Sequence, residues 1–271
     1  FRSKAALEGA VWDLYAKRKG RPLYQLLGGV RNKVEVGISL GMEEKITDLL
    51  QKIDTYVQKG YKRVKIKVNR DQDITVLKEI RRHFPDVPLM VDANSAYTLK
   101  DLDHLRRFDE FGLLMIEQPL AEDDIFDHAI VQREIETPIC LDESIHSYTD
   151  VKLAVALGSC RVINIKQGRV GGLSVAKQMH DYCATNNLKV WVGGMVDGGR
   201  GRAQNIALAT LQQFTFPGDI GASSHYWERD IIIPEVEVVD GTIRLSDRPG
   251  IGYDIDWEAV DYYCVDKRTY S

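Results

Sequence analysis

Two lysines lie two positions apart in a short apolar segment, VKIKV at residues 64–68. Side chains alternate between the two faces of a β-strand, so Lys65 and Lys67 would share one face, and the apolar residues around them would share the other. Burying an unpaired ammonium group is costly. If the strand is buried on both faces, a polar pocket must therefore receive the two lysines.

Further charged residues recur along the chain at intervals of one strand–helix unit. The spacings are 25, 25, 25 and 24 residues, and the five residues are Lys67, Asp92, Glu117, Asp142 and Lys166. Each lies at or just after the end of an apolar segment. Any one of them could be merely the first polar residue of a loop, but five in register indicate a functional site. In a parallel barrel these positions meet at one mouth, where barrel enzymes hold their chemistry.

The chemistry that suits this set is removal of a proton next to a carboxylate. Asp92, Glu117 and Asp142 are hard oxygen ligands without histidine or thiolate nearby, which suits Mg²⁺, with Mn²⁺ as a substitute. Lys67 and Lys166 would flank the metal. A partly desolvated lysine near a second cation, here Lys65, has a lowered pKa and can act as a general base. The metal would hold the negative charge that develops on the substrate.

The elements that must position these residues alternate along the chain. Amphipathic helices such as EEKITDLLQKIDTYVQKG and DITVLKEIRRHF separate the apolar segments. This alternation predicts a parallel sheet with helical crossovers, and seven or eight units favour a closed barrel. The absence of Gly-x-Gly-x-x-Gly after the first strand counts against a dinucleotide-binding fold. We expect strands at 34–40, 63–68, 88–92, 113–117, 138–142, 161–165 and 189–192.

The composition is typical of a soluble globular protein. The chain has 271 residues, of which 44% are hydrophobic and 28% charged, and its net charge is -4. We expect a small-molecule carboxylate substrate and a cytoplasmic location. We expect no nucleic-acid or membrane partner, since the chain has neither a basic excess nor an apolar run of spanning length. The four cysteines show no pairing or zinc-binding pattern, so we expect them to be unpaired.

Six motifs resemble the enolase superfamily, in its muconate-lactonizing-enzyme-like subgroup. They are VKIKV, VDANSAY, MIEQPL, LDESI, INIKQGRVGG and GGM. The resemblance implies a (β/α)7β TIM-like barrel, a homo-oligomer, and the superfamily's pattern of a lysine base with Mg²⁺. LDESI, NIKQGRVGG, PGDIGAS and RPGIGYDID most resemble the branch of ortho-succinylbenzoate synthases and N-succinylamino acid racemases. That branch implies a carbon–oxygen lyase that forms ortho-succinylbenzoate in menaquinone biosynthesis. The alternatives are racemisation of N-succinyl or other N-acylamino acids and dipeptide epimerisation.

The resemblance also implies a role for each matching residue. Lys67 matches the base that removes the α-proton, and Lys65 matches its partner. Lys166 matches the lysine on the opposite face, a stabilising cation in dehydration and the second acid or base in racemisation. The residues that match metal ligands are Asp92, Glu117 and Asp142. The residues that match substrate contacts or supporting polar groups are Asn94, Glu143, Asn164, Ser39, Gly193, Gly194 and Met195.

The chain departs from the family pattern in two places. Family members carry an N-terminal α+β capping domain, which we expect to be missing from this chain. Residues 1–30 would then be the helix that links to the cap, 31–225 the barrel, and 226–271 a C-terminal segment that returns toward the cap. Apolar surface on these flanking segments would be left exposed. Near the seventh strand, Asp197 replaces the family's glutamate and Arg200 adds a charge.

Two readings from other classes stay open. Lys166 on a sixth strand could form an imine, as in a Schiff-base aldolase, although three spaced carboxylates argue against it. The chain could also be an inactive barrel fragment that lacks its cap. The glycine-rich stretch GGRGRA is a possible anion-binding turn, but a loop cluster of glycines explains it more simply.

Overall fold

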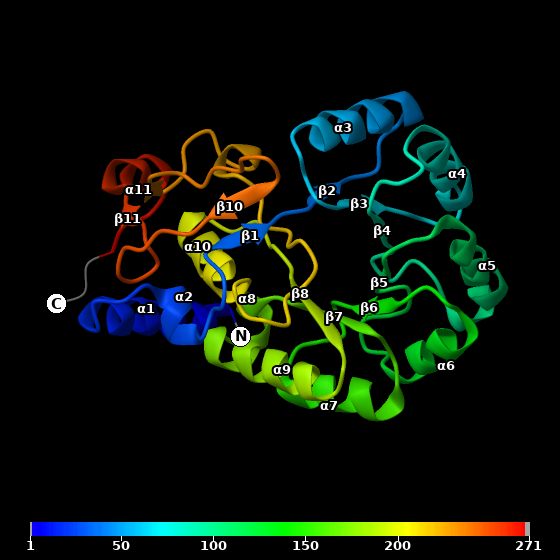
Figure 1. Cartoon of the computed structure of the whole chain (residues 1–271), viewed down its shortest axis with the longest axis horizontal. Coiled ribbons are helices and arrows are strands. Elements are labelled where there is room, and N and C mark those ends of the chain that lie inside the picture. Colours follow the sequence, from blue (N-terminus) through cyan, green and yellow to red (C-terminus); the bar gives the residue numbers. More distant parts are fainter. Residues whose placement is uncertain (1, 269–271) are drawn as a thin grey trace.

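Seven parallel strands form a curled sheet at the centre of the computed structural model, which describes residues 2–268 (Figure 1). The strands follow the chain order, and each pairs with its sequence neighbour. They are β2 (Ile38–Leu40), β3 (Val64–Lys67), β4 (Leu89–Asp92), β5 (Ile116–Glu117), β6 (Ile139–Leu141), β7 (Val162–Ile165) and β8 (Lys189–Val192). The expected α/β fold with a TIM-like parallel barrel is therefore confirmed.

An irregular segment, 214–219, connects the two edges of this sheet. One parallel bridge joins it to β8 through Phe214 and Val190, and another joins its Gly218 to Val36, two residues before β2. The segment has too few ladder hydrogen bonds to count as a regular strand. It nevertheless occupies the place of an eighth strand and closes the ring.

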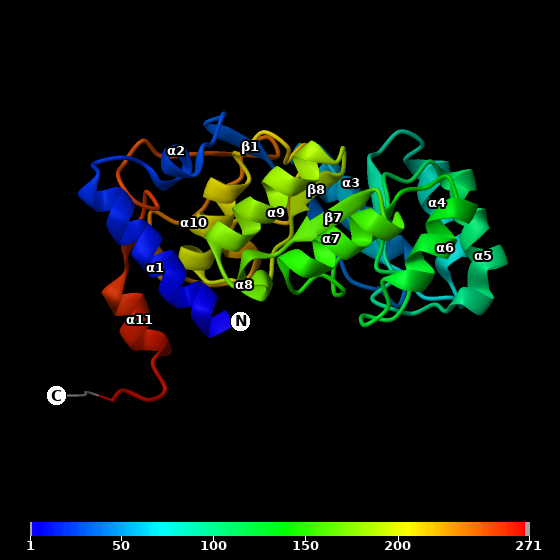
Figure 2. The same cartoon turned by 90° about the horizontal axis from the view of Figure 1, so that it is seen from below.

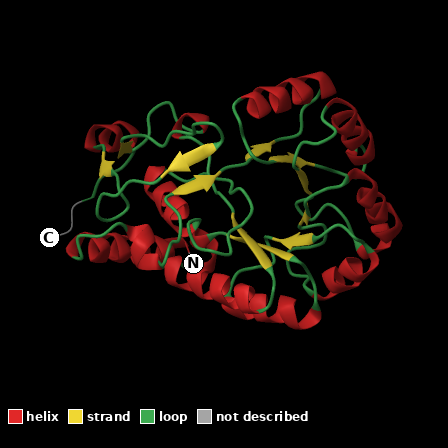
Figure 3. Cartoon of the chain, in the orientation of Figure 1, coloured by secondary structure: helices red, strands yellow, loops and turns green. Residues whose placement is uncertain are grey.

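Helices cover the outside of the ring (Figure 3). Parallel strands need crossover connections of this kind, and the helices bury one apolar stripe against the sheet. In α3 the stripe includes Leu49 and Ile53, and in α4 it includes Leu77 and Ile80. The helices are α3 (Ile46–Gln58), α4 (Asp73–His83), α5 (Leu102–Arg106), α6 (Phe126–Glu134), α7 (Tyr148–Leu157), α8 (Gln167–Val170), α9 (Leu173–Thr185) and α10 (Gly199–Leu208). Short 3₁₀ turns lie at Leu99–Asp101, Arg107–Phe111 and Ser223–His225.

A second, smaller apolar cluster fills the inside of the barrel. It consists of Met90, Met115, Cys140, Val162 and Trp191. Strand alternation puts the residue two positions further on the same face, so Asp92, Asp142 and Asn164 also point inward. The apolar cluster therefore packs directly below the inward-facing polar residues.

The N-terminal part differs from the sequence expectation at two points. The expected strand 34–40 is divided into β1 (Lys33–Glu35), which pairs antiparallel with β10 (Thr242–Arg244), and β2 in the barrel. At the division a Cβ on Gly37 would lie 2.4 Å from Cζ of Arg63, so only glycine fits there. The linking helix expected within residues 1–30 is divided into α1 (Arg2–Arg18) and α2 (Leu23–Leu27). Gly20, at φ 63°, and Pro22 end the first helix, because neither conformation continues it.

The flanking elements gather at one end of the molecule. Figure 2 shows α1 and α11 (Trp257–Tyr263) at the end opposite α4, α5 and α6. A two-stranded sheet of β9 (Ile232–Ile233) and β11 (Asp254–Ile255) precedes α11. All four cysteines are unpaired, as expected. Within residues 2–268, none of the helices combines the length and the apolar character that crossing a bilayer requires.

Candidate active site

The three carboxylates expected as metal ligands lie side by side at the carboxyl ends of adjacent strands. Asp92 ends β4, Glu117 ends β5, and Asp142 follows β6. The register puts Asp92 directly opposite Glu117. All three side chains are buried. The 25-residue spacing in the sequence therefore corresponds to neighbouring positions in the barrel.

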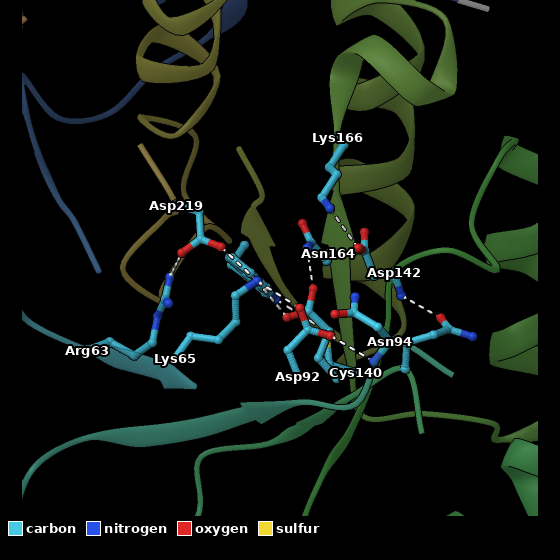
Figure 4. Close-up of polar contacts among 12 residues, drawn as sticks. Arg63, Lys65, Asp92, Asn94, Cys140, Asp142, Asn164, Lys166 and Asp219 are labelled. Carbon is cyan, nitrogen blue, oxygen red and sulfur yellow. Dashed lines mark hydrogen bonds and ion pairs between the residues drawn. The ribbon is translucent and has the colours of Figure 1, made fainter. Parts of the chain in front are cut away.

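Lys65 lies at the centre of a buried ion-pair network (Figure 4). Its Nζ lies 2.9 Å from Oε2 of Glu117, 2.8 Å from Oδ2 of Asp219 and 3.5 Å from Oδ2 of Asp92. Burial alone would lower the pKa of Lys65, but these three carboxylates raise it well above its ordinary value. Burial raises the pKa of Glu117, and Lys65 opposes that rise. Lys65 is thus a fixed cation, held among the carboxylates.

Lys166 approaches the cluster from the other side of the barrel. Its Nζ donates to Oδ2 of Asp142 at 2.6 Å, and Nη2 of Arg169 donates to Oδ1 at 2.6 Å. Burial would raise the pKa of Asp142, but the two cations hold it below its usual range. Arg169 was not expected from the sequence. It lies three residues after Lys166 in α8, which is one helical turn, and this spacing is the signal that could have revealed it.

Lys67 differs from the expectation that both lysines of the pair face the carboxylates. Its side chain is exposed, and within residues 2–268 it forms no hydrogen bond or ion pair. As the last residue of β3 it stands at the rim, where it lines a cavity of about 60 Å³ with Glu43 and Glu44 from the loop after β2. The two lysines therefore lie on the same face of β3, as predicted, but only Lys65 is buried among the carboxylates. Lys67 lies at the barrel mouth, on the side open to an incoming molecule.

Amide side chains connect the carboxylates. Nδ2 of Asn164 donates to Oε1 of Glu117 at 2.7 Å, and Nδ2 of Asn94 donates to Oε1 of Glu143 at 3.0 Å. Asn94 has φ 41°, a left-handed conformation that asparagine tolerates better than most residues. The turn after β4 thereby aims this amide across the mouth toward the loop after β6.

The remaining expected contacts lie on β2 and just after β8. Ser39 is partly buried and pairs in register with Lys65. A Cβ on Gly193 would lie 2.1 Å from Oδ1 of Asn164, and one on Gly194 would lie 2.0 Å from the carbonyl oxygen of Asp219. Only glycine permits this close approach. Met195 lines a cavity of about 610 Å³ that also reaches Lys166, Asp197 and Arg200.

Two further charged residues complete the network and were not expected. Asp219, on the closing segment, accepts from Nη2 of Arg63 at 2.6 Å. The same Arg63 nitrogen donates to the carbonyl of Pro217 at 2.9 Å, and the guanidinium lies 5.0 Å from the ring centroid of Trp191. Asp219 was missed because the closing segment has no apolar strand pattern. Arg63 was missed because nothing in the sequence marks it as buried.

The carboxylates do not surround a common point in this structure. Within residues 2–268, no three Asp, Glu, His or Cys side chains form a group that would hold a metal ion, and each expected ligand instead contacts a lysine or arginine. The donor set still fits a hard divalent cation, because it consists only of oxygen atoms. Oδ1 of Asn164 and Oε2 of Glu143 are buried acceptors with no hydrogen-bond partner. A carboxylate oxygen that accepts from lysine also keeps lone pairs for a cation.

Comparison with known proteins agrees with the barrel fold. The family model described as "Enolase C-terminal domain-like" matches residues 48–260. The chain belongs to the enolase superfamily. The o-succinylbenzoate synthase of Geobacillus stearothermophilus is 62% identical to this enolase-superfamily chain over 261 residues, which cover 96% of the chain and 70% of that protein. The N-succinylamino acid racemase of Thermus thermophilus is 47% identical over 269 residues, which cover 99% of the chain and 73% of that protein.

A solved structure shows the same architecture. It is an enolase-superfamily member from Enterococcus faecalis, with a TM-score of 0.92 and 49% sequence identity. The alignment covers 96% of this chain and 70% of that one. The expected membership of the synthase and racemase branch of the enolase superfamily is confirmed.

Proposed function

We propose that this chain removes the proton next to a substrate carboxylate, and that its main reaction is the dehydration that forms o-succinylbenzoate in menaquinone biosynthesis. The observation that carries the proposal is the row of buried carboxylates at successive strand ends, flanked by Lys67 and Lys166. The 62% identity to an o-succinylbenzoate synthase favours the dehydration within that chemistry.

Asp92, Glu117 and Asp142 would hold the cation, Mg²⁺ or Mn²⁺ in its place. Bound Mg²⁺ would supply positive charge against the negative charge that develops on the substrate carboxylate. Asn164 would help to fix Glu117, to which it donates at 2.7 Å. Asn94, through its hydrogen bond to Glu143, would fix the loop that borders the substrate.

Lys67 is the proposed base because it is the lysine at the open side of the mouth. Its neutral amine takes the α-proton, and the electron pair left on the α-carbon forms the new double bond as the β-hydroxyl leaves. The same ammonium returns its proton to the departing hydroxyl, which yields water and restores the amine. Both events take place on one face of the substrate, so one lysine suffices. Lys166 contributes positive charge from the opposite face.

Racemisation of N-succinylamino acids is the second candidate. It is favoured by the 47% identity to a racemase and by Lys166, which stands opposite Lys67 and can deliver a proton to the other face. An epimerase of dipeptides would use the same residues. The 30% identity to the L-Ala-D/L-Glu epimerase of Clostridium acetobutylicum favours it less.

The deciding experiment measures turnover of two substrates by one preparation. These are the hydroxylated cyclohexadiene precursor of succinylbenzoate and a single enantiomer of an N-succinylamino acid. We expect rapid dehydration, its loss in excess EDTA, and its recovery with Mg²⁺ or Mn²⁺. Turnover of the N-succinylamino acid alone would make racemisation the function. Activity that persists in excess EDTA would contradict the metal site, and a folded protein inactive on both substrates would indicate an inactive fragment.

A further inference from the structure

Asp219 joins two buried cations on the segment that closes the barrel. Its Oδ1 accepts from Nη2 of Arg63 at 2.6 Å, and its Oδ2 lies 2.8 Å from Nζ of Lys65. Figure 4 shows the aspartate between the guanidinium and the ammonium group. Both cationic side chains are almost completely buried. The carboxylate is thus their shared counter-charge.

Lys65 also contacts two of the proposed cation ligands. Its Nζ lies 2.9 Å from Oε2 of Glu117 and 3.5 Å from Oδ2 of Asp92. A divalent cation held by Glu117 and Asp92 would need these carboxylates and would repel the ammonium group next to it. Of the three carboxylates that contact Lys65, Asp219 is the one outside the proposed ligand set. It is therefore the partner that Lys65 can keep when the other two bind a cation.

The surroundings of Asp219 are rigid. Its backbone N–H donates to the carbonyl of Val192 at 3.0 Å, and its own carbonyl lies where a Cβ on residue 194 would be, so a glycine is needed there. Arg63, its other partner, is held by the Pro217 carbonyl at 2.9 Å and by the face of Trp191. Asp219 is therefore held in one position, whereas the ammonium group of Lys65 is carried on a flexible four-carbon side chain.

The charges in the network are balanced. The carboxylates are Asp92, Glu117, Asp142 and Asp219, and the cations are Arg63, Lys65, Lys166 and Arg169. Loss of the Asp219 charge would leave Lys65 with only the proposed ligands as partners. It would also give the network a net positive charge before any divalent cation enters.

We propose that Asp219 is a positioning residue that retains Lys65 as its ion-pair partner when Glu117 and Asp92 take the divalent cation. This inference rests on the proposed metal site. It assigns the cation affinity of that site in part to a residue that does not bind the cation. Residues that orient ligands in this indirect way typically change metal affinity about 10- to 100-fold.

The test is titration of the full chain with Mn²⁺. Binding is measured by calorimetry or from the electron paramagnetic resonance signal of the free ion. Asp219→Asn keeps the shape and removes the charge, and should weaken Mn²⁺ binding at least about tenfold. Asp230→Asn is the matched control. Asp230 is another buried aspartate, bonded to Oγ of Ser223 at 2.6 Å and to the backbone of Gly199 at 2.7 Å, and it contacts none of the network. It should leave Mn²⁺ affinity within about twofold, whatever it does to thermal stability.

A double-mutant cycle separates positioning from simple attraction of the cation. In a Lys65→Met background, Asp219→Asn should change Mn²⁺ affinity less than about threefold, because the residue it positions is gone. An equal loss in both backgrounds would overturn the positioning role. If Asp219→Asn alone does not melt cooperatively, the pair Arg63→Met with Asp219→Asn leaves no unpaired guanidinium and removes one charge of each sign. A loss of affinity in that charge-balanced variant supports positioning, and wild-type affinity overturns it.

Failure of this inference differs from failure of the proposed function. A wild-type chain that binds no Mn²⁺ would defeat the metal site, and this inference with it. Wild-type binding together with unchanged affinity of folded Asp219→Asn would defeat only the role of Asp219.

Discussion

At the scale of single residues, the environment of a lysine, and not its residue type, determines the role that we propose for it. Lys65 and Lys67 lie two positions apart on β3, yet the first is enclosed by three carboxylates and the second is exposed at the rim. An ammonium group held by three carboxylates stays protonated, which suits a fixed charge. Lys67, at the open rim, can reach a substrate, which suits a base.

The two opposed lysines give a test of mechanism. Lys67→Ala should abolish both dehydration and racemisation, because both begin with loss of the α-proton. Lys166→Arg keeps the charge but is a very poor proton donor, so it should stop racemisation and retain some dehydration. In D₂O, proton NMR should show this variant exchanging the α-proton of one N-succinylamino acid enantiomer without inverting it. Equal loss of both reactions in Lys166→Arg would contradict the single-base dehydration.

A buried histidine should make stability depend on pH. His128 is fully buried, its Nε2 accepts from the backbone of Leu120 at 3.2 Å, and burial lowers its pKa. The unfolded chain then binds a proton more readily than the folded chain, so stability should fall as the pH drops below about 6.5. Urea unfolding from pH 8 to pH 5 should show this decrease. His128→Gln should make this decrease smaller, whereas His83→Gln, at an exposed position, should not. A His128→Gln profile parallel to wild type would exclude this origin.

At the scale of elements, α1 is fastened to the barrel through a helix end. Its Glu8 accepts from the backbone N–H of Leu173 at 2.7 Å and of Ser174 at 2.9 Å, in the first turn of α9. A Cβ on Gly172 would lie 2.2 Å from Oε2 of Glu8, so the turn before α9 needs glycine. A carboxylate at a helix N-terminus satisfies free N–H groups and complements the helix dipole. One side chain thus caps α9 from another element.

Removal of this cap should be measurable. Glu8→Ala should lower the free energy of unfolding by about 1–2 kcal/mol, the usual effect of losing an N-terminal cap. Glu79→Ala is the control, since its contact with Arg82 on α4 is a surface ion pair at 3.0 Å, and such pairs contribute about 0–1 kcal/mol. Denaturant unfolding gives both values. Equal effects would show that the Glu8 cap adds nothing beyond surface charge.

At the scale of the whole molecule, one end exposes an apolar surface. Leu7, Val11 and Leu14 are 73%, 65% and 59% exposed and lie on one face of α1. Their spacing of four and three residues forms a stripe. Ile233 and Val239 in the C-terminal part are also exposed. The expectation that the flanking segments leave apolar surface uncovered is confirmed. A continuous apolar stripe of this kind favours association.

The stripe should drive self-association of this chain. Leu7→Gln combined with Val11→Gln should lower the concentration-dependent shift in sedimentation velocity, because it removes apolar contact area. The thermal midpoint should change little, since exposed positions contribute within about ±0.5 kcal/mol. Phe126→Gln is the control, because Phe126 is 64% exposed and belongs to α6, which lies at the other end of the molecule (Figure 2). If the control reduced self-association by the same amount, the effect would not be specific to the stripe on α1.

The amino-acid sequence alone predicted the features that depend on local pattern. Alternating apolar segments and amphipathic helices predicted the barrel, and the 25-residue interval placed Asp92, Glu117 and Asp142 on adjacent strand ends. Side-chain period and strand order are local properties, so they can be counted along the chain. The prediction of one continuous strand at 34–40 was wrong, because the chain leaves one sheet and enters another at Gly37. The buried Arg63 side chain leaves no room for a Cβ at that position, and the sequence pattern does not show this contact.

The tertiary structure decided which charges meet. Lys65 and Lys67 are equivalent by pattern, and only the packing of the neighbouring strands and the closing segment buries the first and leaves the second at the rim. Asp219 lies 156 residues from Arg63, on a segment without strand periodicity, and pairs with it at 2.6 Å. Such a pair leaves no periodic signal in the sequence, because its two members belong to different elements that meet only when the barrel closes. The interaction free energy of buried charges depends on that closure, since burial removes the water that would otherwise screen them.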